Sequence, residues 1–256
     1  MPRMNLEGSS SIVTGGASGI GRATSLVLAR EGATIAVSDI DADGGEETLS
    51  AIKDMGGDGM FVHADVSRPA DVEAMVGAVI QAYGRLDCAY NNAGIEGYWG
   101  GRLHEYPEDT FDRLMDVNVK GVWLCLKYEI PEMLKQGGGA IVNTASAAGL
   151  VGSRRLSVYS ASKHAVVAIS KQLGHELADH QILVNCICGG IIDTPMWDQI
   201  DREMTALEGG SPGSVIARTI KRIPLQRMAK PEEVANVVTF LASDEASYIT
   251  ADAINV

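Results

Sequence analysis

Tyr159 and Lys163 lie four residues apart in a stretch, residues 159–178, whose pattern predicts a helix. This spacing puts the phenol and the ammonium on one face of the helix, within a single turn. A free tyrosine has a pKa of about 10, which is too high for an effective base at neutral pH, and a nearby cation favours the phenolate. We therefore expect Lys163 to lower the pKa of Tyr159 and the pair to move a proton.

Ser146 supports this interpretation of the pair. It follows a predicted strand, residues 140–144, and precedes Tyr159 by thirteen positions. A residue just beyond the carboxyl end of a parallel strand lies at the sheet edge where open α/β sheets bind ligands. The hydroxyl of Ser146 can then hydrogen-bond the same substrate oxygen as Tyr159. Together the three residues predict acid–base chemistry at a hydroxyl or carbonyl group.

A glycine-rich segment, Thr14 to Gly21, joins the first predicted strand (residues 10–14) to the first predicted helix (residues 19–30). Glycines let a backbone approach a ligand closely, and a helix N-terminus attracts a pyrophosphate. Asp39 ends the second predicted strand, where a carboxylate accepts hydrogen bonds from ribose hydroxyls. Because Asp39 repels a 2′-phosphate and Ile40 supplies no compensating cation, these residues predict NAD rather than NADP.

Short apolar runs alternate with amphipathic stretches along the chain, which is typical of βαβ units and a parallel sheet. We expect a single doubly wound α/β domain of the Rossmann type over residues 1–256, with helices on both faces and strand order 3-2-1-4-5-6-7. Residues 189–230 break the alternation with two amphipathic pieces, so we expect a substrate-binding lid there. The other predicted strands are residues 34–38, 60–63, 88–90, 182–187 and 253–256, and the other predicted helices are residues 46–55, 71–83, 107–135 and 231–242.

Charge and cysteine usage exclude several classes of partner. The 256 residues carry 21 Lys and Arg against 33 Asp and Glu, a formal net charge of −12, which repels nucleic-acid backbones and anionic membranes. No apolar stretch approaches the roughly 20 residues that a membrane span requires. The four cysteines and five histidines lack zinc-site spacing, and the cysteines are typical of buried residues in a reducing compartment. We predict a cytoplasmic protein with no metal, no nucleic-acid partner and no membrane partner.

In order and spacing, these motifs resemble the short-chain dehydrogenase/reductase family across nearly the whole chain. The resemblance implies that Tyr159 is the catalytic acid–base and that Ser146 polarises the carbonyl or hydroxyl of the substrate. It also implies that Lys163 binds the ribose and lowers the tyrosine pKa, and that Asn118 holds a proton-relay water. The matching segments are Thr14–Gly21, Asn91-Asn92-Ala93-Gly94, Val117-Asn118-Val119, Ser146 and the Tyr159/Lys163 pair.

The same resemblance implies the cofactor contacts. Asp65 and Val66 match the pair that borders the adenine ring, and Ile192 and Thr194 match the residues that meet the nicotinamide carboxamide. Ala251 replaces a glycine of the family pattern, which is expected to shift a tight turn. The full expected NAD-binding set is Gly15, Ser18, Gly19, Ile20, Gly21, Asp39, Asp65, Val66, Asn92, Ala93, Gly94, Tyr159, Lys163, Ile192 and Thr194.

The expected substrate pocket has a mainly apolar wall. It suits a neutral, bulky or cyclic secondary alcohol, alicyclic or steroid-like, which NAD would oxidise to a ketone. Two alternatives stay open: an NADPH-dependent ketone or 3-oxoacyl thioester reductase, against which Asp39 argues, and a non-catalytic NAD-binding redox sensor. Two long predicted helices, residues 107–135 and 159–178, together with the resemblance predict a homotetramer or homodimer. The expected pocket residues are Ser146, Ala148, Val151, Tyr159, Met196 and Trp197.

Overall fold

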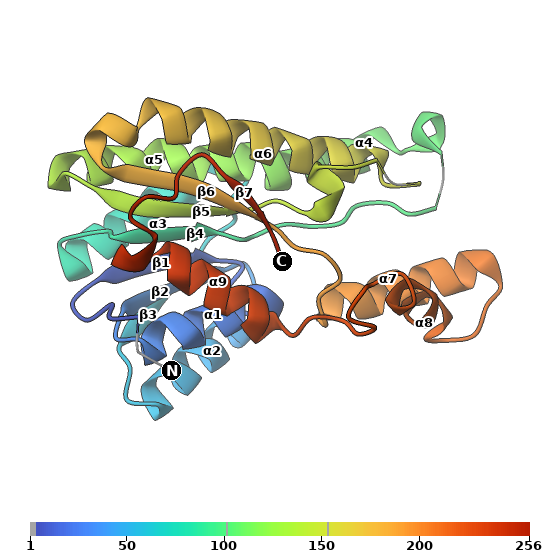
Figure 1. The fold of residues 1–256 in the computed structure, drawn as a ribbon, viewed down its shortest axis with the longest axis horizontal. Coiled ribbons are helices and arrows are strands. Elements are labelled where there is room, and N and C mark those ends of the chain that lie inside the picture. Colours follow the sequence, from blue (N-terminus) through green and yellow to red (C-terminus); the bar gives the residue numbers. More distant parts are fainter. Residues whose placement is uncertain (1–3, 101, 153) are drawn as a thin grey trace.

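Seven parallel strands form one sheet in the order β3-β2-β1-β4-β5-β6-β7, which confirms the predicted topology (Figure 1). The computed structural model describes residues 4–100, 102–152 and 154–256. The sheet grows in opposite directions from β1, so the carboxyl ends of β1 and β4 open a crevice suited to a ligand. The strands are β1 (Ser10–Thr14), β2 (Thr34–Asp39), β3 (Gly59–His63), β4 (Cys88–Asn91), β5 (Gly139–Thr144), β6 (Ile182–Cys188) and β7 (Ala253–Asn255).

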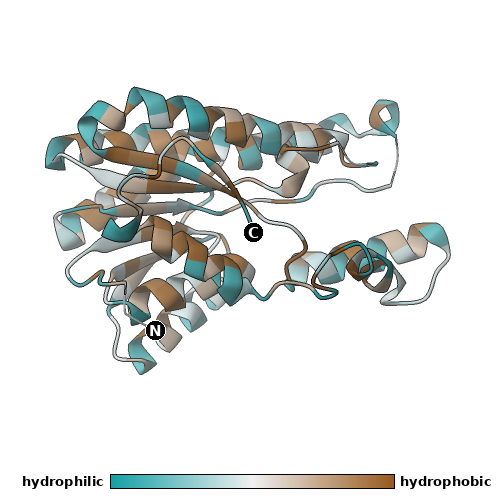
Figure 2. Cartoon of the chain, viewed as in Figure 1, coloured by the Kyte–Doolittle hydropathy of each residue, from teal (hydrophilic) through white to brown (hydrophobic). Residues whose placement is uncertain are grey.

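Helices cover both faces of the sheet. Neighbouring strand residues point to opposite faces, so Ile12 packs on one side and Val13 on the other. The strands are mostly hydrophobic, and hydrophilic residues lie on the outer helices (Figure 2). Such burial on both faces explains the short apolar runs of the sequence. One layer consists of α1 (Gly19–Arg30), α2 (Ala42–Asp54) and α9 (Pro231–Leu241), and the other of α3 (Pro69–Tyr83), α5 (Val122–Gln136) and α6 (Ser157–Glu176).

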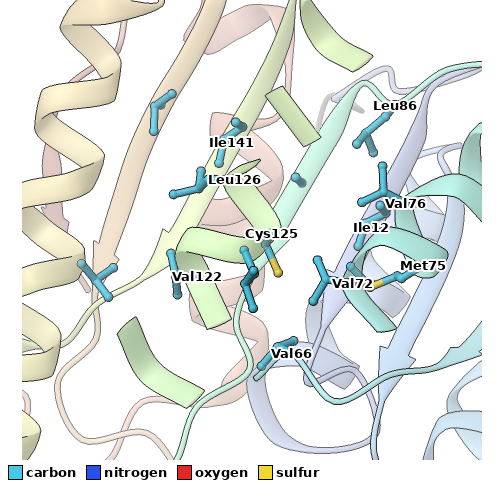
Figure 3. Close-up of a cluster of buried hydrophobic side chains, with 14 of the residues drawn as sticks. Ile12, Val66, Val72, Met75, Val76, Leu86, Val122, Cys125, Leu126 and Ile141 are labelled. Atoms are coloured by element: carbon cyan, nitrogen blue, oxygen red, sulfur yellow. The ribbon is translucent and has the colours of Figure 1, made fainter. Parts of the chain in front are cut away.

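A cluster of buried side chains fills the space between the sheet and the layer of α3, α5 and α6 (Figure 3). Ile12 and Ile141 from the strands belong to the same cluster as Val72 and Met75 from α3 and Leu126 from α5. Burying a side chain of this size stabilises the fold by about 1.5–3 kcal/mol. This core holds the strands, and therefore the residues at their carboxyl ends, in fixed positions.

Helix starts follow local capping chemistry. α2 begins at Ala42, before the predicted residues 46–55, because the Asp41 carboxylate accepts a 3.2 Å hydrogen bond from the backbone N–H of Gly44. α3 and α9 each begin with a proline. Proline suits a first helical position, because that position needs no backbone N–H donor.

The helix predicted over residues 107–135 consists of two helices joined by a wider turn. α4 (Glu108–Met115) and α5 are connected by a π-helical segment, Asp116–Gly121. Such a segment adds one residue to the helical turn and is frequent at functional sites. Here it contains Asn118, one of the predicted catalytic residues. The apolar periodicity of the sequence does not reveal the extra residue.

The segment 189–230 extends beyond the sheet and carries α7 (Pro195–Glu208) and α8 (Ser214–Ile220), the two amphipathic pieces of the prediction (Figure 1). The Asp201 carboxylate of α7 accepts hydrogen bonds of 2.6–3.1 Å from three backbone N–H groups at the start of α8, which joins the two helices. At the base of the segment, Ile192 pairs with Ala229 as an isolated parallel bridge. Within the described ranges, no helix combines the length and apolar character of a membrane span.

Ala251 adopts a left-handed backbone conformation with φ of 60°, which glycine adopts more readily than alanine. Its backbone N–H donates a 2.8 Å hydrogen bond to the carbonyl oxygen of Val184. The residue packs against Gly174, where an added Cβ would come within 2.5 Å of the Ala251 nitrogen. An alanine therefore forms the turn for which the family pattern has a glycine.

Candidate functional site

A cleft of about 320 Å³ lies at the carboxyl ends of the strands and brings together most of the predicted site residues. Gly21, Asn118, Ala148 and Val151 are not among its lining residues, and Val151 is 62% exposed. The predicted residues that line it are Gly15, Ser18, Gly19, Ile20, Asp39, Asp65, Val66, Asn92, Ala93, Gly94, Ser146, Tyr159, Lys163, Ile192, Thr194, Met196 and Trp197.

The glycine-rich turn between β1 and α1 forms a cradle for a phosphate group. Gly15 has φ of 67°, and a Cβ there would lie 2.8 Å from Nδ2 of Asn92. A Cβ at Gly21 would collide with the carbonyl oxygen of Gly15. Gly21 therefore allows the turn to pack closely and does not form part of the cleft surface. The side chain of Ser18 makes no capping hydrogen bond to α1. The first-turn N–H groups of α1 are therefore suited to an anionic ligand.

Asp39 is held beside this turn at the end of β2. Its Oδ2 accepts a 2.9 Å hydrogen bond from the backbone N–H of Ala17, and its Oδ1 accepts a 3.0 Å bond from that of Asp41. Asp39 and Ile40 both line the cleft. A carboxylate fixed in this way can accept hydrogen bonds from a sugar hydroxyl and repels a phosphate. The turn and Asp39 therefore fit a dinucleotide.

Arg113 of α4 is a lining residue that the sequence motifs did not indicate. Its Nη1 lies 3.9 Å from Oδ2 of Asp65, and the other carboxylate oxygen of Asp65, Oδ1, accepts hydrogen bonds from the backbone N–H and the hydroxyl of Ser67. The residue precedes Asn118 in the predicted helix, but a single arginine on a helix normally indicates a solvent-exposed face. Other lining residues without a prior prediction are Ser38, Ile40, Ala64, Tyr90, Ile95, Val117, Thr144, Ala145, Ile187, Gly189, Gly190, Pro195 and Val234.

A hydrogen-bond network connects the glycine turn with the floor of the cleft. Asn92 donates from Nδ2 to the carbonyl oxygens of Thr14 and Gly15, at 3.1 and 3.2 Å. Its Oδ1 lies 3.3 Å from the hydroxyl of Thr144, which is also 2.9 Å from the hydroxyl of Tyr90. The network fixes β1, β4 and β5 relative to one another at their carboxyl ends.

Tyr159 and Lys163 lie near each other on α6, but each has its own partner. Lys163 Nζ lies 5.8 Å from the centre of the Tyr159 ring and donates a 2.8 Å hydrogen bond to the carbonyl oxygen of Thr144. Burial raises the pKa of Tyr159 to about 12, outweighing the opposite effect of the Ser146 hydroxyl. Burial also lowers the pKa of Lys163 to about 8. Desolvation of the phenol is therefore the largest influence on its pKa in this structure, and a pKa-lowering effect of Lys163 on Tyr159 stays a prediction.

Asn118 lies behind the cleft rather than on its surface. Its Oδ1 accepts a 2.8 Å hydrogen bond from the backbone N–H of Ile95, and its Nδ2 donates a 2.8 Å bond to the carbonyl oxygen of the same residue. A Cβ added at Gly94 would lie 3.3 Å from both Asn118 Oδ1 and Lys163 Nζ. The asparagine thus holds the loop after β4 next to the lysine.

The four cysteines, Cys88, Cys125, Cys186 and Cys188, are free and buried, as the sequence indicated. In the part of the chain that the structure describes, no group of His, Cys, Asp and Glu side chains has the arrangement of a metal site. The chemistry-bearing groups of the cleft are therefore a phenol, a hydroxyl, an ammonium and the dinucleotide cradle. Such a set can move one proton while a bound dinucleotide carries a hydride.

Comparison with known proteins gives consistent matches over the chain. A protein-family model described as enoyl-(acyl carrier protein) reductase matches residues 15–256. The cyclohexanol dehydrogenase of Acinetobacter sp. (strain SE19) is 38% identical over 239 residues, covering 93% of this chain and 89% of that protein.

Two solved structures show the same fold. An NAD+-bound xylitol dehydrogenase matches with a TM-score of 0.93 and 31% identity, covering 98% of each chain. A variant of actinorhodin polyketide ketoreductase with NADPH matches with a TM-score of 0.93 and 35% identity, covering 97% of this chain and 95% of that one. The similar proteins are therefore oxidoreductases, and their structures hold either form of the nicotinamide cofactor.

Proposed function

The chain belongs to the short-chain dehydrogenase/reductase family, and we propose that it interconverts a secondary alcohol and a ketone with NAD as the hydride carrier. One observation carries the proposal: Ser146, Tyr159 and Lys163 line the same cleft as the glycine turn and Asp39. The cradle and the acid–base group therefore act on one bound pair of cofactor and substrate.

In the direction of oxidation, Tyr159 as phenolate takes the proton of the substrate hydroxyl, and Ser146 holds the same oxygen. Bound NAD+ supplies the hydride acceptor and a positive ring that favours the phenolate. Lys163 binds the nicotinamide ribose and stabilises the phenolate by its charge. Asn118 holds a water that returns the proton to solvent. The protein thus orients the reactants and moves one proton.

Asp39 supports NAD over NADP. Its carboxylate is fixed at the end of β2 by the backbone N–H groups of Ala17 and Asp41, and Ile40 beside it carries no charge. Four further residues of the expected cofactor set also line the cleft. We expect Asp65 and Val66 to contact the adenine ring, and Ile192 and Thr194 to contact the carboxamide. An NADPH-dependent ketone or thioester reductase is the second candidate, favoured by the likeness to the NADPH-bound ketoreductase.

Met196 and Trp197 at the cleft support a neutral, bulky or cyclic substrate, as does the likeness to a cyclohexanol dehydrogenase. The experiment is a panel of cyclic, linear and charged alcohols with purified protein, read by NADH fluorescence with NAD+ and by NADPH fluorescence with NADP+. We expect turnover of cyclic alcohols with NAD+. Turnover confined to charged hydroxy acids contradicts the substrate class, and cofactor binding without any turnover supports the redox-sensor alternative.

The segment 189–230 is proposed as a substrate lid of a single domain, because α7 and α8 are joined through Asp201 and extend beyond the sheet.

We also propose a cytoplasmic homotetramer or homodimer. Phe111 on α4 is 44% exposed and Trp123 on α5 is 49% exposed, which leaves apolar surface suited to a partner subunit. Sedimentation at micromolar concentration tests this, and a monomer contradicts it.

A further inference from the structure

Ser38 carries a buried hydroxyl that has no hydrogen-bond partner among the described residues. The residue is the last but one of β2, is 1% exposed, and lines the cleft. Of the described residues with a buried, unpartnered side-chain atom, only Ser38 lines the cleft. An unpaired buried hydroxyl costs free energy that a ligand in the cleft can recover. Ser38 is therefore a ligand contact that none of the sequence motifs indicates.

Ser38 and Asp39 point to opposite faces of the sheet, because successive side chains of a strand alternate between its faces. Ala36, two residues before Ser38, packs in the core on the side of α3 and α5, whereas Val37, two residues before Asp39, packs in the core on the side of α1 and α9. Asp39 accordingly reaches the glycine turn, where its carboxylate accepts a hydrogen bond from the N–H of Ala17. Ser38 therefore contacts a different part of a bound dinucleotide from the part that Asp39 holds.

The side of the cleft that Ser38 faces is apolar. Ala64, which follows β3, is held beside β2 by a 3.1 Å hydrogen bond from its backbone N–H to the carbonyl oxygen of Asp39. Ala64, Val66 and Val117 line the cleft and belong to the buried core on the side of α3 and α5. A phosphate or a sugar needs several polar partners, whereas a nucleobase has apolar ring faces and a few polar atoms on its edge. One hydroxyl among apolar side chains therefore suits a planar base.

From these observations we propose that the hydroxyl of Ser38 donates a hydrogen bond to a ring nitrogen of the adenine base of the cofactor. The inference deepens the proposed function, and it rests on the binding of a nicotinamide dinucleotide in the cleft, whether NAD or NADP. A ring nitrogen of adenine is an acceptor, and a serine hydroxyl can donate to it. Ser38 then binds the base while Asp39 binds the ribose, so two successive residues of β2 recognise two adjoining parts of one ligand.

The first test measures, by calorimetry, how tightly the unmodified protein and Ser38→Ala bind ADP-ribose, which carries the adenine but no nicotinamide. Loss of the hydrogen bond should weaken binding about five- to tenfold. The midpoint of thermal unfolding, measured without ligand, should stay the same or rise, because the substitution removes a buried hydroxyl that has no partner among the described residues. Unchanged binding, or weaker binding together with a clearly lower midpoint, would overturn the contact.

Ser11→Ala is the matched control. Ser11 lies on β1, is 1% exposed like Ser38, and also has a hydroxyl without a partner among the described residues, but it does not line the cleft. ADP-ribose should bind this variant as tightly as it binds the unmodified protein. An equal loss of affinity in Ser11→Ala and Ser38→Ala would mean that any change in these strands weakens the cleft, which contradicts a direct contact.

A second ligand, ADP-ribose without the 2′-hydroxyl of its adenosine ribose, separates a contact to the base from a contact to the ribose. This ligand lacks the hydroxyl that Asp39 is expected to bind. The factor by which the 2′-deoxy change weakens binding should be the same in the unmodified protein and in Ser38→Ala, because contacts to separate groups act independently. The same factor should fall toward one in Asp39→Ala. A factor that falls toward one in Ser38→Ala would assign the hydroxyl to the ribose and overturn the contact to the base.

The outcomes also separate this contact from the proposed activity. Binding of ADP-ribose that depends on Ser38, in a protein that oxidises no alcohol of the panel, would reject the activity and support the contact. Alcohol oxidation by a protein whose affinity for ADP-ribose is the same in Ser38→Ala would overturn the contact and leave the activity standing. Failure of the unmodified protein to bind ADP-ribose, NADH or NADPH would reject both.

Discussion

The ammonium of Lys163 donates a 2.8 Å hydrogen bond to the carbonyl oxygen of Thr144. Lys163 is 3% exposed, and its charge is therefore held by the end of β5 rather than by solvent. This anchor directs the ammonium to the cleft surface between β5 and α6. In the proposed mechanism the lysine acts on Tyr159, one turn away on α6, through its charge, so the protonation state of Lys163 matters for the reaction.

Replacing Lys163 tests that role. Lys163→Met should lower kcat/KM roughly 100- to 10,000-fold, because acid–base catalysis loses its supporting charge. Lys163→Arg keeps a charge that is not titrated in proteins. Because burial lowers the pKa of Lys163 to about 8, activity of the unmodified protein should fall above that pH, and the arginine variant should keep its activity to higher pH. Equal pH–rate profiles for lysine and arginine would contradict this.

Tyr159→Phe removes the proposed proton acceptor and should lower kcat/KM roughly 100- to 10,000-fold. Burial raises the pKa of Tyr159 to about 12, so the phenolate fraction, and with it the rate of alcohol oxidation, should rise with pH until Lys163 loses its proton. Stopped-flow measurement of the hydride step tests both the loss of rate in Tyr159→Phe and the rise of the rate with pH. Tyr128→Phe on α5, outside the cleft lining, is the control and should leave the rate unchanged. Undiminished turnover by Tyr159→Phe would refute the mechanism.

Asp39→Asn should shift the cofactor preference toward NADP+. The amide loses the negative charge that repels a 2′-phosphate, and the ratio of kcat/KM for NADP+ to that for NAD+ should rise at least about tenfold. Asp41→Asn is the matched control, because Asp41 caps α2 through Gly44. It should change stability slightly and leave the cofactor ratio unaltered. An unchanged ratio in Asp39→Asn would mean that other groups select the cofactor.

Glu129 should make folding stability depend on pH. This carboxyl group on α5 is fully buried, accepts a 3.0 Å hydrogen bond from Nδ2 of Asn91, and burial raises its pKa to about 7. The folded protein holds the proton over a pH range in which the unfolded chain, with a pKa near 4.5, has released it. Stability from this group is therefore full below pH 4.5 and is lost as pH rises to about 7.

Glu129→Gln should remove this loss, which is on the order of 3 kcal/mol. The measurement is the free energy of unfolding in urea from pH 4.5 to 8 for both proteins. Glu132→Gln, on the same helix but paired with Lys135 near the surface, is the control and should follow the unmodified protein. Parallel curves for Glu129→Gln and the unmodified protein would disprove the prediction.

The sheet, its strand order and the main helices could be predicted because alternating apolar and amphipathic stretches directly reflect burial on both faces of a parallel sheet. The residues brought to the cleft by strand ends, such as Asp39 and Ser146, followed from the same topology. The predicted first residues of the helices were less accurate, because a helix start depends on a single capping hydrogen bond. The start of α2, for example, is set by the cap at Asp41. The sequence also did not indicate the π-helical segment Asp116–Gly121.

Three properties, two of the site and one of the buried core, depend on packing and could not be predicted. The pKa of Tyr159 is raised rather than lowered, because its burial is a property of the folded site. Glu129 follows the residue pattern of an ordinary helix, and its burial against Asn91 appears only when β4 and α5 meet. Arg113 reaches the cleft because α4 passes over Asp65. Each case involves residues that are distant in sequence and meet in the fold.

The π-helical segment sets the rotational phase between α4 and α5. Successive side chains of a helix are rotated by about 100° around the helix axis. Loss of one residue between Asp116 and Gly121 would swing the whole outer surface of α5, including Trp123, by about that angle relative to Arg113. A deletion in this segment would therefore displace Asn118 and redirect the exposed Trp123 at the same time.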